Sequence, residues 1–142
     1  LYILKRELTW LPLFGWYLLK AGMIGVNRSA GGRTLIDITK RAAEEIRRGR
    51  QLLIFPEGTR TRDGAVGRFK SGAAYLARHL DKKIIPVTIR GAFDIMPPGK
   101  GLPRFTGGHR LELLVGTPVD PKDFSSIEAL TDHLRNIIAG QT

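Results

Sequence analysis

An apolar stretch that ends abruptly in a turn is the feature that most constrains how this chain folds. Residues 52–55 are all apolar and run directly into Pro-Glu-Gly-Thr-Arg at residues 56–60. Such a run predicts a buried strand, and Pro56 ends it because proline lacks the N–H that a sheet hydrogen bond needs. Gly58 lets the backbone approach a ligand closely, and Arg60 adds a planar, permanently charged guanidinium. The segment predicts an anion-binding turn at a strand end, although an ordinary surface turn has the same composition.

Apolar periodicity along the rest of the chain predicts strands that alternate with helices. Strands are expected over residues 24–27, 51–55, 84–89 and 110–115. Helices are expected over 7–21, 33–48 and 70–80, and a last one opens at a capping box formed by Ser125 and Glu128. Residues 94–109 hold three prolines and four glycines and are expected to form a long loop. This alternation favours an α/β fold, with helices on the faces of a sheet.

Four sequence blocks, in this order, resemble those of the glycerolipid acyltransferase family, which includes the 1-acyl-glycerol-3-phosphate acyltransferases. The blocks are residues 5–8 with 12–15, residues 25–29, residues 55–64 with 69–72, and residues 84–89. The resemblance implies an α/β fold of the glycerol-3-phosphate acyltransferase type, with a mixed central β-sheet flanked by helices. We expect residues 1–142 to form a single domain of this kind.

The family's first motif, a histidine followed five positions later by an aspartate, does not occur in this sequence. His79, His109 and His133 are followed at that spacing by Ile84, Leu114 and Ile138. In the family the histidine of this motif is the general base. We therefore expect a domain that is N-terminally incomplete, with its catalytic residues upstream of Leu1 and no catalytic residue within this chain. By itself the chain is expected to be inactive, and its three histidines to be solvated or capping residues.

The resemblance implies transfer of a fatty acyl group to 1-acyl-glycerol-3-phosphate, which gives phosphatidic acid. The acyl thioester, carried by coenzyme A or acyl carrier protein, is a co-substrate, and no cofactor or metal is expected. Arg28 and Arg60 are the primary candidates for binding the phosphate, and Lys5 and Lys70 are secondary ones. Glu57 is expected to accept a hydrogen bond from a glycerol hydroxyl or to hold an arginine. Gly58 and Thr59 complete the predicted substrate-binding set.

Charge and composition limit the classes of partner. The net charge is +10, and residues 1–70 carry 14 Lys or Arg against 6 Asp or Glu. Phosphorylated small molecules and an anionic membrane surface both suit this charge, whereas no nucleic-acid-binding motif is recognisable. There are no cysteines, which excludes disulfides and a thiol nucleophile. The oligomeric state cannot be predicted from these features.

Membrane association at the cytoplasmic face is expected from an apolar segment near the start of the chain. Residues 8–19 carry Trp10, Trp16 and Tyr17, which favour the membrane–water interface. The segment is too short and too interrupted to span a bilayer, which takes roughly 20 apolar residues. The same rings also suit a helix packed on a protein core.

Two alternatives to a lysophosphatidate acyltransferase stay open at this stage. The first is a non-catalytic domain that binds anionic lipid headgroups. The second is an acyltransferase for another polar lipid acceptor. An upstream histidine box separates the enzyme from the binding domain, since only the enzyme needs a base.

Overall fold

The computed structural model describes residues 3–5, 24–26, 31–59, 61–97 and 107–142. The chain divides into two compact units, Leu1–Phe55 and Pro56–Thr142. The single domain expected over residues 1–142 stays a prediction. Within the described residues, no helix combines the length and the apolar character needed to cross a membrane. The expected helix over 7–21, with both tryptophans, lies outside the described residues.

The first unit contains a parallel strand pair and a long helix. β1 (Ile3–Lys5) pairs with β2 (Ile24–Val26), and Ile3 lies opposite Ile24. α2 (Gly31–Arg47) follows and ends at Gly49, whose φ of 79° suits glycine. The N–H groups of Gly49 and of the next residue bond back to the last turn of the helix, which closes it. The strand predicted over 24–27 and the helix predicted over 33–48 are thus confirmed, with small shifts at their ends.

The prediction of a buried strand over 51–55 is wrong, because the stretch is neither buried throughout nor a regular strand. Within this stretch Leu53 alone takes part in a bridge. Leu53 and Phe55 are 40% and 58% exposed, while Leu52 and Ile54 are half-buried. The burial therefore alternates, as in an extended segment that is covered on one side. Four apolar residues in a row do not by themselves decide whether both sides are covered.

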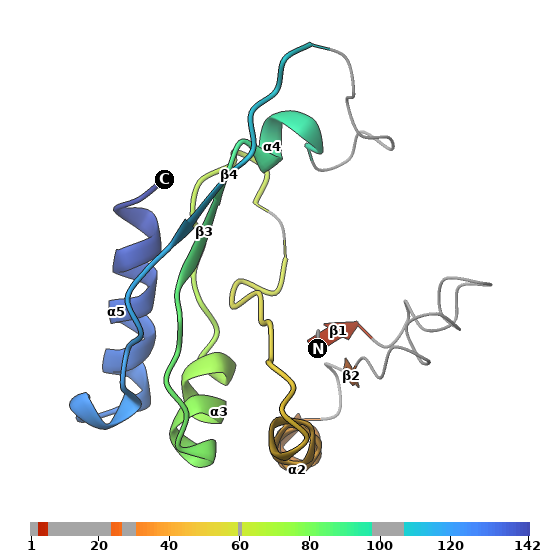
Figure 1. Ribbon diagram of the computed structural model, residues 1–142, viewed down its shortest axis with the longest axis vertical. Helices are drawn as coiled ribbons and strands as arrows, with labels where there is room; N and C mark the ends of the chain where they lie inside the picture. The colour runs from red at the N-terminus through yellow and green to blue at the C-terminus, as the bar shows by residue number, and fades with distance from the viewer. Residues whose placement is uncertain (1–2, 6–23, 27–30, 60, 98–106) are drawn as a thin grey trace, which may run out of the picture. The chain divides into compact units, whose positions relative to one another are not determined.

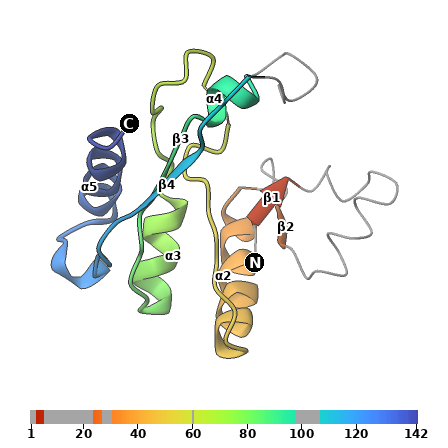
Figure 2. The same ribbon diagram turned by 45° about the horizontal axis from the view of Figure 1, so that its top comes forward.

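The second unit contains an antiparallel strand pair and two main helices (Figure 1). α3 (Gly72–Leu80) is followed by β3 (Val87–Arg90), the short helix α4 (Ala92–Ile95) and β4 (Glu112–Val115). A single 3-10 turn, η2 (Pro121–Asp123), leads into α5 (Ile127–Ala139). α5 runs alongside the β3–β4 pair in both views (Figures 1 and 2). These elements confirm the helix predicted over 70–80 and the strand predicted over 110–115, each beginning two residues later than expected.

The prediction of one continuous strand over 84–89 is wrong, because the strand pairing is interrupted within this stretch. Ile84 makes an isolated bridge to Val119, and the regular ladder starts at Val87, opposite Val115. The register differs by one residue between these two pairings, so the segment from Gly116 to Val119 carries one extra residue, as in a β-bulge. Pro86 lies at the interruption, and because it has no N–H it can only accept a bond, from Gly116, at 2.8 Å.

One face of this strand pair is exposed. Ile85, Ile89, Leu113 and Val115 are between 41% and 71% exposed. Thr88 points the other way, is 1% exposed and donates a hydrogen bond to Gln141 beyond the end of α5. The pair is therefore covered on the side of the C-terminus only.

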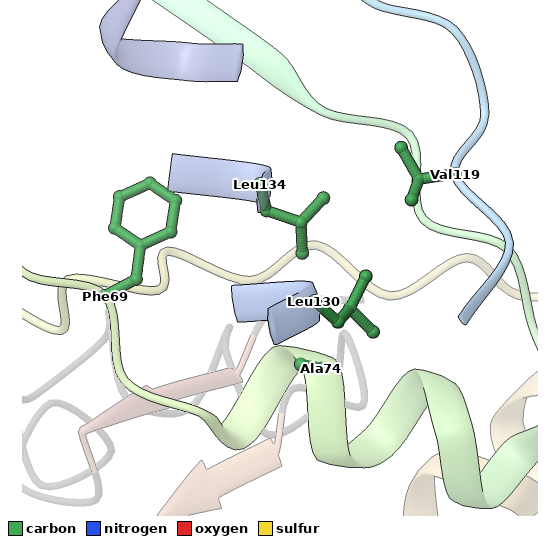
Figure 3. Packing of buried hydrophobic residues seen from close by; sticks show 5 residues of the cluster. All are labelled: Phe69, Ala74, Val119, Leu130 and Leu134. Carbon is green, nitrogen blue, oxygen red and sulfur yellow. The ribbon is translucent and has the colours of Figure 1, made fainter. Parts of the chain in front are cut away.

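The core of the second unit lies between α3 and α5, together with the segment before α3 and the segment between β4 and η2. Its buried members are Phe69, Ala74, Val119, Leu130 and Leu134 (Figure 3). Leu130 and Leu134 are 0% and 5% exposed, and they come from one face of α5 as its periodicity predicts. Ile127 and Ile137, also expected on that face, pack against the cluster.

The N-cap of α5 is Ser126, so the capping box predicted at Ser125 and Glu128 is wrong by one residue. The Ser126 hydroxyl accepts a hydrogen bond of 3.0 Å from the N–H of Ala129, three residues on. The spacing to Glu128 favours Ser125 in the sequence, whereas in the structure Ile127 and Leu130 pack on the core and the helix is capped by Ser126.

An exposed ion pair links the end of α3 to η2. Asp81 ends α3 in the left-handed conformation, with φ 50°, and its carboxylate lies 2.7 Å from the Lys122 ammonium. The hydrogen bond and the charge of Lys122 lower the pKa of Asp81 below its ordinary value. The same contact raises the pKa of Lys122.

Candidate functional site

The structure describes four of the seven predicted substrate-binding residues with their side chains. These are Glu57, Gly58, Thr59 and Lys70, which all belong to the second unit. Arg28 and Arg60, the primary candidates for the phosphate, lie outside the described residues. Lys5 lies in β1, and its side chain is not among those described.

Gly58 and Lys70 lie next to each other in the candidate turn. Gly58 has φ 69°, in the left-handed region that favours glycine. A Cβ placed on Gly58 would lie 3.4 Å from Cε and 3.5 Å from Nζ of Lys70. The carbonyl of Pro56 accepts a hydrogen bond of 2.8 Å from the N–H of Lys70, which holds the two segments together. Residues 12 positions apart in sequence thus place an ammonium group over the bare backbone of the turn.

Glu57 is held by the backbone of the following loop. Its Oε2 atom accepts a hydrogen bond of 2.9 Å from the N–H of Gly67, in a partly buried setting. A Cβ on Gly67 would come within 2.8 Å of that oxygen, so the contact requires glycine there. The other carboxylate oxygen, Oε1, has no hydrogen-bond partner among the residues that the structure describes. One oxygen therefore fixes the side chain and the other is available to a ligand.

The loop over residues 61–66 is closed by its own hydrogen bonds. The Thr61 hydroxyl donates to the carbonyl of Ala65 at 2.7 Å, and the N–H of Ala65 donates to Asp63 at 3.1 Å. Gly64 has φ 77°, and a Cβ there would lie 3.1 Å from the ring of Phe93 in α4. The loop is therefore shaped by its sequence and covered by a short helix.

The described cations of this region have no carboxylate partner among the residues that the structure describes. Arg62, Arg68 and Lys70 are exposed, and none forms an ion pair within the described part of the chain. The two nearby acids, Glu57 and Asp63, accept bonds from backbone N–H groups, and neither forms an ion pair with a described cation. At the end of α2, by contrast, the arginines pair with glutamates at 2.5–3.2 Å. Unpaired cations beside an open backbone turn can bind a phosphate or carboxylate.

Sequence reasoning missed two residues of this site, Gly67 and Arg135. Nε of Arg135, in α5, donates to the carbonyl of Gly67 at 3.0 Å, across 68 positions in sequence. A second contact, from Nη2 to the carbonyl of Val66, measures 3.4 Å. A glycine after a basic loop was a visible signal for Gly67, whereas nothing local marks Arg135. Thr59, which was predicted, has an exposed side chain.

The three histidines are exposed and lie on other elements, as expected. His79 bonds to the carbonyl of Tyr75 at 3.0 Å and stacks on its ring at 3.8 Å. His133 lies on α5 with its ring 4.8 Å from that of Phe124. In the described ranges, no three side chains of His, Asp or Glu are placed to hold a metal ion. A shallow open pocket between α3 and α5 is lined by Arg78, His79, Ser125, Ile127 and Glu128, and so excludes the candidate turn.

Comparison with known proteins decides the family. Residues 1–90 match the model of a protein family described as Acyltransferase, and that range includes the whole candidate turn. The chain belongs to this acyltransferase family. The match ends before β4 and α5, so Arg135 lies outside the matched range.

Relatives of this acyltransferase chain occur in plants, bacteria and mammals. It is 35% identical over 98 residues to a chloroplastic 1-acyl-sn-glycerol-3-phosphate acyltransferase of Brassica napus, which covers 69% of this chain and 28% of the relative. It is 38% identical over 85 residues to a Pseudomonas aeruginosa protein of the same name, covering 60% and 33%. It is 31% identical over 136 residues to the mouse alpha form, covering 94% and 47%. The chain thus spans less than half the length of these relatives.

A solved structure has the same fold. The Thermotoga maritima 1-acyl-sn-glycerophosphate acyltransferase PlsC is similar to the chain with a TM-score of 0.73 and 31% identity. The likeness covers 99% of this chain and 54% of that one. It confirms the α/β acyltransferase fold expected from the sequence.

Proposed function

We propose that the protein containing this chain transfers a fatty acyl group from a thioester to 1-acyl-glycerol-3-phosphate. The observation that carries this proposal is the identity of 31–38% to acyltransferases of that name in a plant, a bacterium and the mouse. The exposed Lys70 ammonium beside Gly58 supports it, because the acceptor carries a phosphate, which such a group binds well. The acyl donor is either acyl-CoA or a fatty acyl group carried as a thioester on acyl carrier protein, and no further cofactor takes part.

The residues of the turn have different roles in this proposal. Lys70 binds the acceptor phosphate, and Arg60, Arg28 and Lys5 stay further candidates for it from the sequence. The Oε1 atom of Glu57 accepts a hydrogen bond from a hydroxyl of the acceptor, because the carboxylate would repel the phosphate itself. Gly58 and Thr59 let the acceptor lie close to the backbone. Holding both substrates in register in this way contributes up to about 7–11 kcal/mol toward lowering the barrier.

The general base is proposed to lie outside residues 1–142. Deprotonating the acceptor hydroxyl needs a base within hydrogen-bond reach, and such help typically gives about 10²–10⁴-fold. His79 is stacked on Tyr75 and His133 packs by Phe124, on elements that do not form the turn. None of the three histidines has the family's spacing to an aspartate.

A second acceptor class is favoured by one particular relative. The chain is 36% identical over 96 residues to a lyso-ornithine lipid O-acyltransferase of Pseudomonas aeruginosa, covering 68% of this chain and 36% of that protein. An ornithine lipid offers a carboxylate or amine in place of the phosphate. Comparing kcat/KM for lysophosphatidate and lyso-ornithine lipid in the full-length protein separates the two acceptors. A protein that binds anionic lipid but transfers no acyl group would instead be the non-catalytic binding domain.

The residues proposed to bind the acceptor phosphate form a phosphate clamp, and this clamp can be tested at Arg60. In the full-length protein, Arg60→Ala should lower kcat/KM for lysophosphatidate by about tenfold or more, since a hydrogen bond to a charged group is worth about 1.5–3 kcal/mol. Arg60→Lys should restore part of this loss, because an ammonium group keeps the charge without the forked geometry. Steady-state kinetics at varied acceptor concentration give both values. Arg78→Ala, an exposed arginine on α3, is the matched control. Unchanged kcat/KM in Arg60→Ala would remove Arg60 from the clamp.

The protein is further proposed to act at the cytoplasmic face of a membrane. Lysophosphatidate and its product are lipids, and the positive charge of residues 1–70 suits an anionic surface. The protein would then extract its acceptor from the lipid layer on which it lies.

A further inference from the structure

One polar link between α5 and the candidate turn runs through the peptide group that joins Val66 to Gly67. The peptide that joins Val66 to Gly67 presents its carbonyl to Nη2 of Arg135 at 3.4 Å and its N–H to Oε2 of Glu57 at 2.9 Å. A cation thus lies at one end of the peptide dipole and an anion at the other. Hydrogen bonds arranged in series in this way polarise and strengthen one another. The orientation of this peptide therefore depends on both charged side chains.

Arg135 makes a second hydrogen bond to the loop, and the two bonds together favour an arginine at this position. Its Nε atom donates to the carbonyl of Gly67 at 3.0 Å, so the guanidinium bonds two successive carbonyls, those of Val66 and Gly67. Arg135 forms no ion pair with a carboxylate among the described residues. Its side chain is half-buried, and two backbone carbonyls are its partners. A planar fork fits two neighbouring carbonyls, whereas an ammonium group has a less fixed geometry.

The loop is also attached to the same helix by apolar contacts. Phe69 is 7% exposed and belongs to the core with Leu130 and Leu134 of α5, which lie close to it in Figure 3. Val66 packs against this core as well. These contacts decide where the loop lies, but apolar packing does not decide which way a peptide group points. The polar contacts of Arg135 supply that orientation.

We propose that Arg135 is a positioning residue for the acceptor site: it orients the Val66–Gly67 peptide, whose N–H holds Glu57 so that Oε1 faces the acceptor. The inference rests on the proposed function of the turn. Arg135 touches neither substrate, and it acts through Gly67 and Glu57. Its effect therefore falls on use of the acceptor and leaves binding of the acyl donor unchanged.

A double-mutant cycle in the full-length protein tests the proposal. Arg135→Ala should lower kcat/KM for lysophosphatidate by at least about tenfold, since small misplacements of a binding group are costly. The KM for the acyl donor should stay the same. In a Glu57→Ala background, Arg135→Ala should have little further effect, because the side chain that it positions is gone. Arg135→Lys should recover part of the loss, and Arg78→Ala should behave as wild type.

Additive losses in the cycle, or equal rises in KM for both substrates, would overturn the positioning role in favour of a general structural one. A backbone readout separates this failure from a failure of the proposed function. Hydrogen exchange of the Gly67 amide should be faster in Arg135→Ala than in Arg78→Ala, whether or not acyl transfer is seen. A wild-type protein inactive with lysophosphatidate would refute the proposed function. Unchanged exchange at Gly67 would refute the role of Arg135 itself.

Discussion

At the scale of single residues, two glycines of the site are required for different reasons. Gly58 is needed for its backbone, because φ 69° is costly for residues with a Cβ. Gly67 is needed for space, because a Cβ would come within 2.8 Å of the Glu57 carboxylate and 3.1 Å of Thr61. The Glu57 carboxylate thus sits where a side chain at position 67 would be.

Gly67→Ala tests this arrangement. The new methyl group should push Glu57 away from the Gly67 N–H, which lowers kcat/KM for the acceptor and destabilises the fold by about 1–3 kcal/mol. Gly72→Ala is the matched control, because nothing lies within 4 Å of a Cβ there and the residue begins α3. It should be neutral or slightly stabilising, since alanine favours a helix. Thermal unfolding and acceptor kinetics measure both effects, and equal behaviour of the two variants would contradict the steric argument.

At the scale of elements, α5 is the helix that joins the core to the site. One face provides Leu130 and Leu134 to the core, and the adjoining Arg135 reaches the loop that carries Gly67. Leu134 and Arg135 can serve these two purposes because successive residues of a helix point about 100° apart. Ser126 caps the N–H of Ala129 at the start of this helix.

Ser126→Ala should therefore destabilise the protein by about 1 kcal/mol, since the N–H of Ala129 loses its acceptor. Ser125→Ala is the matched control, because it changes the neighbouring serine, which is exposed and is not the cap. It should have almost no effect. Chemical denaturation of the two variants gives the difference. A larger loss in Ser125→Ala would mean that the helix begins one residue earlier.

At the scale of the whole molecule, the distribution of charge favours an anionic surface as the working environment. The net charge of +10 comes mostly from residues 1–70, with 14 basic and 6 acidic residues. Near the turn, Arg62, Arg68 and Lys70 are exposed and form no ion pair with any residue that the structure describes. Unpaired surface cations attract anionic headgroups over about one Debye length.

The protein should consequently bind vesicles that contain anionic lipid, and more weakly in high salt. The Debye length falls from about 10 Å at 0.1 M to about 3 Å at 1 M, so screening removes most of the attraction. Cosedimentation with phosphatidylglycerol vesicles at both salt concentrations measures the effect, and phosphatidylcholine vesicles are the control. A blue shift of tryptophan emission should accompany binding if Trp10 or Trp16 enters the interface. Equal binding to neutral vesicles in 1 M salt would instead indicate a purely apolar anchor.

The sequence by itself determined the features that depend on local chemistry. The stripe of α5, the end of α2 at Gly49 and the turn at Gly58 follow from periodicity and from backbone preferences, which act within a few residues. The same stretch of sequence predicted Glu57 and Lys70 as site residues. The local signals also favoured Ser125 as the cap of the last helix, through its spacing to Glu128, and this was wrong by one residue.

Only the tertiary structure decided which distant groups meet. Arg135 reaches Gly67 across 68 positions, and the strand pair slips by one residue beside Pro86. The exposure of Ile89 and Val115 depends in the same way on what packs against each side of the strands. Such outcomes are set by how whole elements bury their surfaces against one another, and a run of neighbouring residues carries little information about that.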